Sequence, residues 1–137
     1  MSFTDYLEDK ILNHVFGGTA YTAPSTLYVG LHTSASSDAA AGTEVSGGSY
    51  ARQTVAFTVT GTDPTEAATT AAIEFPAATA DWGTVTYAGV YDALTGGNLI
   101  AYAQLTDPSD FSTPLPKQID NGDVFRISSG NLKIRLD

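Results

Sequence analysis

The stretch WGTVTYAGVYDALTGGNLIAYAQL, residues 82–105, decides the fold class. Val, Tyr, Ile and Leu are frequent in two runs, 84–91 and 99–105, and this composition is typical of β-strands. The connection 92–98 contains a Gly-Gly pair, which tolerates the positive φ that tight turns require. The stretch therefore predicts an antiparallel β-hairpin.

Strand patterns also occur on both sides of this hairpin. We expect further strands at 27–32, 50–59, 71–75, 124–127 and 132–136. The residues expected to face the core in two of them are Val55, Phe57, Val59, Leu132, Ile134 and Leu136. Turn signals separate the strands, and Asn121-Gly122 predicts a tight hairpin turn. About seven or eight short strands without alternating helices predict an antiparallel sandwich or barrel, and we favour a jelly-roll-like, all-β sandwich.

The N-terminal segment is the only part of the sequence whose pattern predicts a helix. Phe3, Leu7, Ile11 and Val15 recur every four residues, and two glycines end the pattern at residues 17 and 18. Thr4 is expected to cap the helix start. The helix either covers one end of the sheet or docks on a neighbouring chain. We expect a single domain over residues 1–137, with the helix in 1–18 and the sandwich in 19–137.

Charge and composition exclude several classes of protein. The chain has 137 residues, a charged fraction of only 15%, a net charge of −9 and no cysteine. Its six basic residues form no cluster in the sequence, which argues against binding to nucleic acid or to an anionic membrane. Neither a secretory signal nor a membrane span is expected, and disulfides are impossible.

No catalytic or cofactor motif is evident. The chain lacks Cys and a Gly-x-Ser-x-Gly elbow, and His14 and His32 have no acidic residue at a telling spacing. Asp120–Asp123 resembles part of a calcium loop, but the twelfth position is Asn131 instead of Glu, so we favour a turn. We therefore expect a protein that is not an enzyme and has no cofactor, although a structural cation between chains stays an open alternative.

Five segments resemble a known family. They are FTDYLEDKILNHVFGGTAYTAP (3–24), TLYVGLHTSASSD (26–38), GTEVSGGSYARQTVAF (42–57), WGTVTYAGVYDALTGGNLI (82–100) and IDNGDVFRISSGNLKIRLD (119–137). On these segments the chain resembles small bacteriophage virion proteins, often labelled tail fibre or minor structural proteins. The resemblance implies a non-enzymatic virion component that is made in the host bacterial cytoplasm.

Three functions follow as alternatives. We favour a capsid decoration protein that cements capsomers, because one helix and one sandwich leave no residues for a shaft or receptor-binding tip. A tail fibre or tail-attached protein is the second, and a carbohydrate-binding module the third. The expected partners are the major capsid protein or tail proteins, together with further copies of the chain in a closed ring, especially a trimer. Nucleic acid and membranes are not expected partners.

Contacts with these partners are expected at three places, namely the helix 3–16, the loop 34–49 and the Pro-rich segment 107–116. The low apolar content of the loop suggests that it does not pack on its own. The predicted contact residues are Phe3, Leu7, Ile11, Tyr50, Arg52, Trp82 and Phe111. Arg52 has Glu44 as a candidate ion-pair partner. The carbohydrate-binding alternative would instead use Trp82 or Tyr50 to stack on a sugar.

Overall fold

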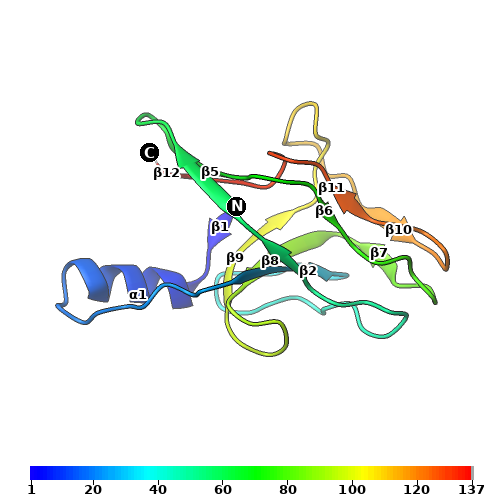
Figure 1. Ribbon diagram of the computed structural model, residues 1–137, viewed down its shortest axis with the longest axis horizontal. Helices are drawn as coiled ribbons and strands as arrows, with labels where there is room; N and C mark the ends of the chain where they lie inside the picture. Colours follow the sequence, from blue (N-terminus) through cyan, green and yellow to red (C-terminus); the bar gives the residue numbers. More distant parts are fainter. Residues whose placement is uncertain (137) are drawn as a thin grey trace.

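The computed structural model describes residues 1–136, which form twelve strands and one helix (Figure 1). The elements are β1 (Ser2–Phe3), α1 (Asp5–Val15), β2 (Leu27–His32), β3 (Gln53–Val55), β4 (Phe57–Thr60), β5 (Thr65–Thr69), β6 (Ile73–Glu74), β7 (Gly83–Val85), β8 (Tyr87–Tyr91), β9 (Leu99–Gln104), β10 (Lys117–Ile119), β11 (Arg126–Ile127) and β12 (Lys133–Leu136). Residue 137, the last of the predicted sandwich range, lies outside the described residues.

Four strand pairs are nested around the β8–β9 hairpin. β8 pairs with β9, β7 with β10, β6 with β11 and β5 with β12, and every pair is antiparallel. The segment from β5 to β8 therefore runs alongside the segment from β9 to β12, as in one long hairpin wrapped on itself. This is the strand pairing of a jelly roll, and it confirms the predicted all-β antiparallel fold.

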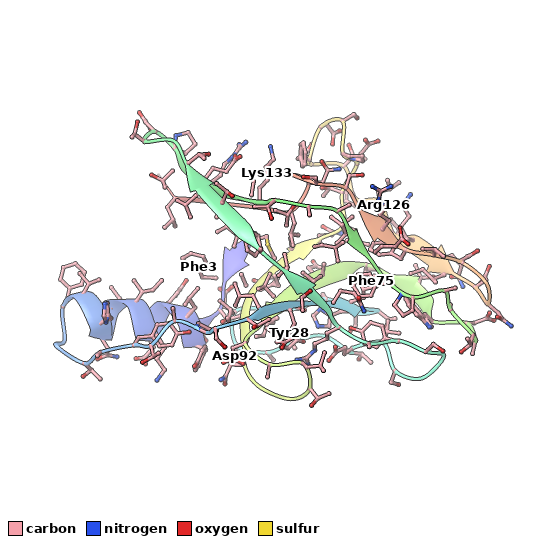
Figure 2. All side chains as sticks on the ribbon, in the orientation of Figure 1. Phe3, Tyr28, Phe75, Asp92, Arg126 and Lys133 are labelled. Atoms are coloured by element: carbon pink, nitrogen blue, oxygen red, sulfur yellow. The ribbon has the colours of Figure 1, made fainter. Side chains whose placement is uncertain are left out.

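The remaining strands widen the sheets. β1, β2 and β3 complete a five-stranded sheet in the order β1-β9-β8-β2-β3, and β4 completes a three-stranded sheet in the order β12-β5-β4. The pairs β11-β6 and β10-β7 form two short sheets. The core between the layers contains Phe75, Trp82 and Val85, and Figure 2 shows Phe75 in the interior.

Several predicted strands are interrupted because the chain changes partners. The predicted strand 50–59 is divided at Ala56 into two strands. The first, β3, pairs with β2, and the second, β4, pairs with β5. The predicted strand 71–75 is reduced to β6, and β5 forms before it. The Asn121-Gly122 turn forms, with a Gly122 φ of 95°, but it joins no hairpin. Its flanking strands β10 and β11 pair with β7 and β6 instead.

Three side-chain orientations differ from the sequence pattern. Val59 and Leu136 were expected in the core but are 67% and 56% exposed. They lie near the β4–β5 turn, where Val59 pairs with Ala67 and Leu136 pairs with Thr65. In the predicted strand 27–32, His32 alternates with the apolar residues Leu27, Val29 and Leu31, and this pattern predicts that it points outward. Its exposure is nevertheless 0%, because the loop after β2 covers that face.

The helix α1 does not cover the end of a sheet. It projects from the β body, and none of its residues is buried (Figure 1). Phe3, which was predicted to begin the apolar stripe of the helix, belongs to β1 and pairs with Ala101. Thr4 occupies the N-cap position, but its side chain makes no cap hydrogen bond. Its hydroxyl donates to the carbonyl oxygens of Leu99 and Ile100, at 2.6 and 3.1 Å.

Candidate functional site

The most prominent surface feature is an arm formed by residues 4–26, which we call the α1 arm. After α1, the chain turns and runs back along the helix (Figure 1). The two parts are connected by a hydrogen bond of 3.0 Å from the Tyr21 backbone N–H to His14 Nδ1. At its base, Thr4 bonds to β9, and the Asp5 N–H donates to the Asp38 carbonyl at 3.0 Å. These hydrogen bonds fix the arm to the body at its base.

The outer face of α1 is both apolar and acidic. Leu12 and Val15, together with Phe16 at the C-cap of α1, are 58%, 61% and 81% exposed. Exposed carboxylates share this face, and they belong to Asp5, Glu8 and Asp9. These six residues are connected by spacings of three and four, which place them on one side of a helix. Three large apolar side chains exposed on one short helix are typical of a protein contact surface.

The predicted helix residues Leu7 and Ile11 lie on α1 but are half-buried, as is Phe3 on β1. Leu12 and Phe16, which are not among the predicted contact residues, are far more exposed. They fall outside the stripe that recurs every four residues. Apolar residues outside a helical stripe indicate a second apolar face, and this signal was present in the sequence.

Three of the predicted contact residues lie in the interior of the chain. Trp82 is buried, and its indole N–H donates to the Gly48 carbonyl at 2.9 Å. Tyr50 is half-buried, stacks on Phe75 at 6.1 Å between ring centroids and donates its hydroxyl to Glu44. Arg52 is only 8% exposed. None of these side chains is free for a partner or a sugar, because each one packs inside the chain and its polar atoms already form internal hydrogen bonds.

Arg52 forms the predicted ion pair with Glu44. Its Nε and one terminal nitrogen donate to the two carboxylate oxygens, both at 2.7 Å. The other terminal nitrogen donates to the carbonyls of Ala93 and Gly96, and the guanidinium lies 3.5 Å from the centre of the Tyr91 ring. Arg52 therefore joins the loop before β3 to the β8–β9 turn.

A second polar cluster surrounds His32. Its Nε2 lies 2.6 Å from the Tyr91 hydroxyl, and its Nδ1 lies 3.2 Å from Ser36 Oγ. Burial lowers the pKa of His32 and raises the pKa of Tyr91 to about 12, so both rings are neutral at pH 7. A serine beside a histidine is also found in nucleophile–base pairs. Here, however, Ser36 is 7% and His32 0% exposed, so a substrate cannot reach either group.

The loop 34–49 packs on the body, contrary to the sequence-based expectation. Val45 is buried, and its N–H donates to the Leu31 carbonyl at 3.0 Å. The Gly42 N–H donates to Ser36 Oγ at 3.0 Å. The loop packs because Val45 enters the core while its polar side chains bond to the chain itself. It is therefore a structural cover over β2.

The Pro-rich segment 107–116 is on the surface. Hydrogen bonds from Thr113 and Ser112 lower the pKa of Asp110 to about 2. The next residue, Phe111, is exposed and has a positive φ of 55°. The Lys133 ammonium lies 5.1 Å from the centre of its ring. Of the predicted contact residues, Phe111 is therefore the one presented on the outside of the β body.

Within residues 1–136, no three His, Cys, Asp or Glu side chains are close enough together to hold a metal ion. No helix in this part of the chain has the length and apolar character needed to span a membrane.

A model of a known protein family matches nearly the whole chain. The family model described as Podophage GP4 fiber I protein gp80 matches residues 2–135. This chain belongs to that family. Among curated proteins, no relative matches it. Membership in the gp80 fibre family confirms the resemblance to phage virion structural proteins, and it supports the alternative prediction of a fibre protein. The prediction of a capsid decoration role is not confirmed.

Proposed function

We propose that this member of the gp80 fibre family is a non-enzymatic component of a phage tail fibre that works through protein–protein contacts of its α1 arm. The single observation that carries the proposal is the outer face of α1, where Leu12, Val15 and Phe16 are exposed. Such a face is unfavourable in water and becomes favourable when a neighbouring protein covers it. The fibre description of the family supports the tail as the place of assembly.

The polar clusters of the chain support a structural rather than a catalytic role. The Glu44–Arg52 pair is satisfied by internal hydrogen bonds, and the His32–Ser36 pair is closed to solvent. Both clusters fasten loops to the sheet instead of presenting reactive atoms. A contact protein present in many copies needs this kind of rigid support for its outer surface.

Electron microscopy of virions tests the location. A peptide tag on the exposed turn 61–64 between β4 and β5, labelled with gold-conjugated antibody, is expected to mark the tail. Label on the capsid and none on the tail would overturn the fibre proposal and support decoration of the head. An enzymatic role is tested separately, because any turnover of host surface polysaccharide by the purified protein would contradict the non-enzymatic proposal.

The arm is tested by incorporation into virions. The double variant Leu12→Ser with Phe16→Ser is expected to fold and to be absent from purified particles. The matched control, Val59→Ser with Leu94→Ser, also removes two exposed apolar side chains, but outside the arm. Normal incorporation of the arm variant would contradict a docking role. Point variants are preferable to deletion of residues 1–16, because that deletion also removes β1 from the sheet.

A further inference from the structure

An open groove of about 880 Å³ lies on one side of the β body. Residues of β1 and β9 line it from the five-stranded sheet, and residues of β11 and β12 line it from the other layer. The segment 105–116 contributes a further part of the wall. The N-terminal ammonium, which donates to the Lys133 carbonyl at 3.3 Å, joins the two layers at the groove.

The groove concentrates the basic residues of an acidic protein. The whole chain has six Lys and Arg residues and a net charge of −9. Four of the six line the groove, namely Lys117, Arg126, Lys133 and Arg135, and Asp110 is the one carboxylate among the lining residues, so the lining keeps an excess of positive charge. Lys133 and Arg135 share the carboxylate of Glu66, whereas Lys117 and Arg126 form no ion pair with any carboxylate of residues 1–136. Lys133 and Arg126 lie on the same side of the body as segment 105–116 (Figure 2).

The groove also offers aromatic surface. The rings that line it belong to Tyr87, Tyr102, Phe111 and Phe125. Phe111 is 48% exposed, and the centres of the Tyr87 and Tyr102 rings are 6.4 Å apart. Aromatic side chains beside cations suit an occupant that has both apolar groups and carboxylates.

We propose, on the basis of the proposed contact function, that the groove of one copy receives the α1 helix of a second copy. The outer face of α1 has the complementary chemistry, with three apolar side chains and the carboxylates of Asp5, Glu8 and Asp9. The 11 residues of α1 span about 16 Å, a length suited to a helix lying in a surface groove. Charge complementarity is the observation that selects this occupant.

The helix of the same chain does not fill the groove. The arm starts beside it, where Met1 and Ser2 line the groove, but Thr4 is bonded to β9 and α1 projects away from the body (Figure 1). The donor and acceptor surfaces are therefore different patches of the same molecule. Such contacts are heterologous, and copies joined in this way form a ring when the rotation closes.

Sedimentation analysis of the full chain between 1 and 100 µM, at low and at moderate salt, tests the proposal. Wild type is expected to form an oligomer that weakens with salt, since charges contribute to the contact. The arm variant L12S/F16S and the groove variant K117E/R126E are each expected to associate at least tenfold more weakly. The control V59S/L94S is expected to behave as wild type. Circular dichroism confirms that each variant keeps its sheet content.

Mixing the two defective variants gives the sharpest test. The arm variant keeps an intact groove, and the groove variant keeps an intact arm, so a mixture is expected to form a 1:1 heterodimer although each alone is monomeric. Adding E8K/D9K to K117E/R126E reverses both charges and is expected to restore the oligomer. Failure of both complementation and charge reversal overturns the proposal, as does a groove variant that assembles normally.

The results also separate this inference from the proposed function. A monomeric wild type that is still found in the tail overturns the helix-in-groove contact and leaves the fibre function intact. An oligomer with the expected variant behaviour, found in particles labelled only on the capsid, supports the contact and overturns the fibre function. A third outcome is that the wild type is a monomer that binds acidic polysaccharide, and that only the groove variants lose this binding. This result would assign the groove to a glycan and overturn the proposal.

Discussion

The guanidinium of Arg52 and the carboxylate of Glu44 meet in a two-point contact, with both nitrogen–oxygen distances at 2.7 Å. The same guanidinium holds the carbonyls of Ala93 and Gly96, so one buried cation connects three separate parts of the chain. Such a planar group with several donors cannot be replaced by lysine without loss of contacts.

Arg52→Leu is expected to lower the free energy of unfolding by about 3 kcal/mol, because it leaves the Glu44 carboxylate without its partner. Urea unfolding followed by tryptophan fluorescence measures the change, with Trp82 as the probe. Arg135→Leu is the matched control, since it breaks an ion pair with Glu66 at the surface and is expected to cost about 0–1 kcal/mol. Equal losses in the two variants would refute the structural role of Arg52.

Stability is expected to fall at acid pH in a window set by Glu44. Burial alone would raise the pKa of Glu44, but hydrogen bonds from Arg52 and Tyr50 outweigh it and hold the pKa below the ordinary value of 4.5. The stabilisation is therefore complete above pH 4.5 and is lost as the pH falls through the folded-state pKa. Unfolding experiments between pH 3 and pH 7 test this, with Glu44→Gln as the variant in which this part of the dependence disappears.

His32 is expected to make the free energy of unfolding depend on pH in a second range, at higher pH than the range set by Glu44. Burial lowers its pKa below the ordinary value of 6.5, so the unfolded chain takes up a proton that the folded chain excludes. Stability is expected to decline as the pH falls below 6.5, with a slope of at most about 1.4 kcal/mol per pH unit. Two-dimensional NMR of the imidazole follows the titration directly. A folded-state pKa at or above 6.5 would contradict the burial of this ring.

Thr4→Val is expected to loosen the base of the α1 arm. The substitution keeps the shape of the side chain but removes the hydroxyl that donates to Leu99 and Ile100. The loss is expected to be about 1 kcal/mol, the net value of a typical hydrogen bond. The backbone amides of α1 are expected to exchange their hydrogens faster in the variant than in the wild type. Thr19→Val, at an exposed position of the same arm, is the control and is expected to leave the exchange unchanged.

Gly89→Ala is expected to destabilise the centre of the five-stranded sheet. A Cβ atom at this position would lie 2.5 Å from Leu99 Cδ1 and 2.7 Å from His32 Cε1. Relief of this overlap requires shifts in a packed region, and we expect a cost of about 1–3 kcal/mol. Thermal unfolding measures the effect against Thr58→Ser, a control on an exposed position of β4. An unchanged midpoint for Gly89→Ala would show that the sheet has room there.

The sequence predicted the fold class well because strand composition and turn residues are local signals. The β8–β9 hairpin and the strand β2 appear where the pattern placed them. Local signals do not determine which strand becomes the partner. For this reason the change of sheet at Ala56 was not foreseen, and neither was the exposure of Val59 beyond it.

The contact residues were harder to predict than the fold. Arg52 and Trp82 were predicted as contact residues, but the tertiary fold encloses both. Trp82 bonds to the loop 34–49 and Arg52 bonds to the β8–β9 turn, and each of these partners is distant in the sequence from the residue that it holds. The N-terminal helix was expected either to cover one end of the sheet or to dock on a neighbouring chain. Which of its faces is exposed depends on where the return segment lies, and periodicity alone does not give that.

The pairing of Thr4 with the first residues of β9 has a consequence for the timing of assembly. Loops that bring distant segments together close slowly, whereas the β8–β9 hairpin closes locally. The N-terminal segment has no place to attach until β9 exists, because Ser2, Phe3 and Thr4 all bond to that strand. During synthesis, almost the whole of the first 104 residues must emerge before α1 acquires its direction. A nascent chain therefore presents no oriented arm to its neighbours, which delays recruitment into the particle until the subunit has folded.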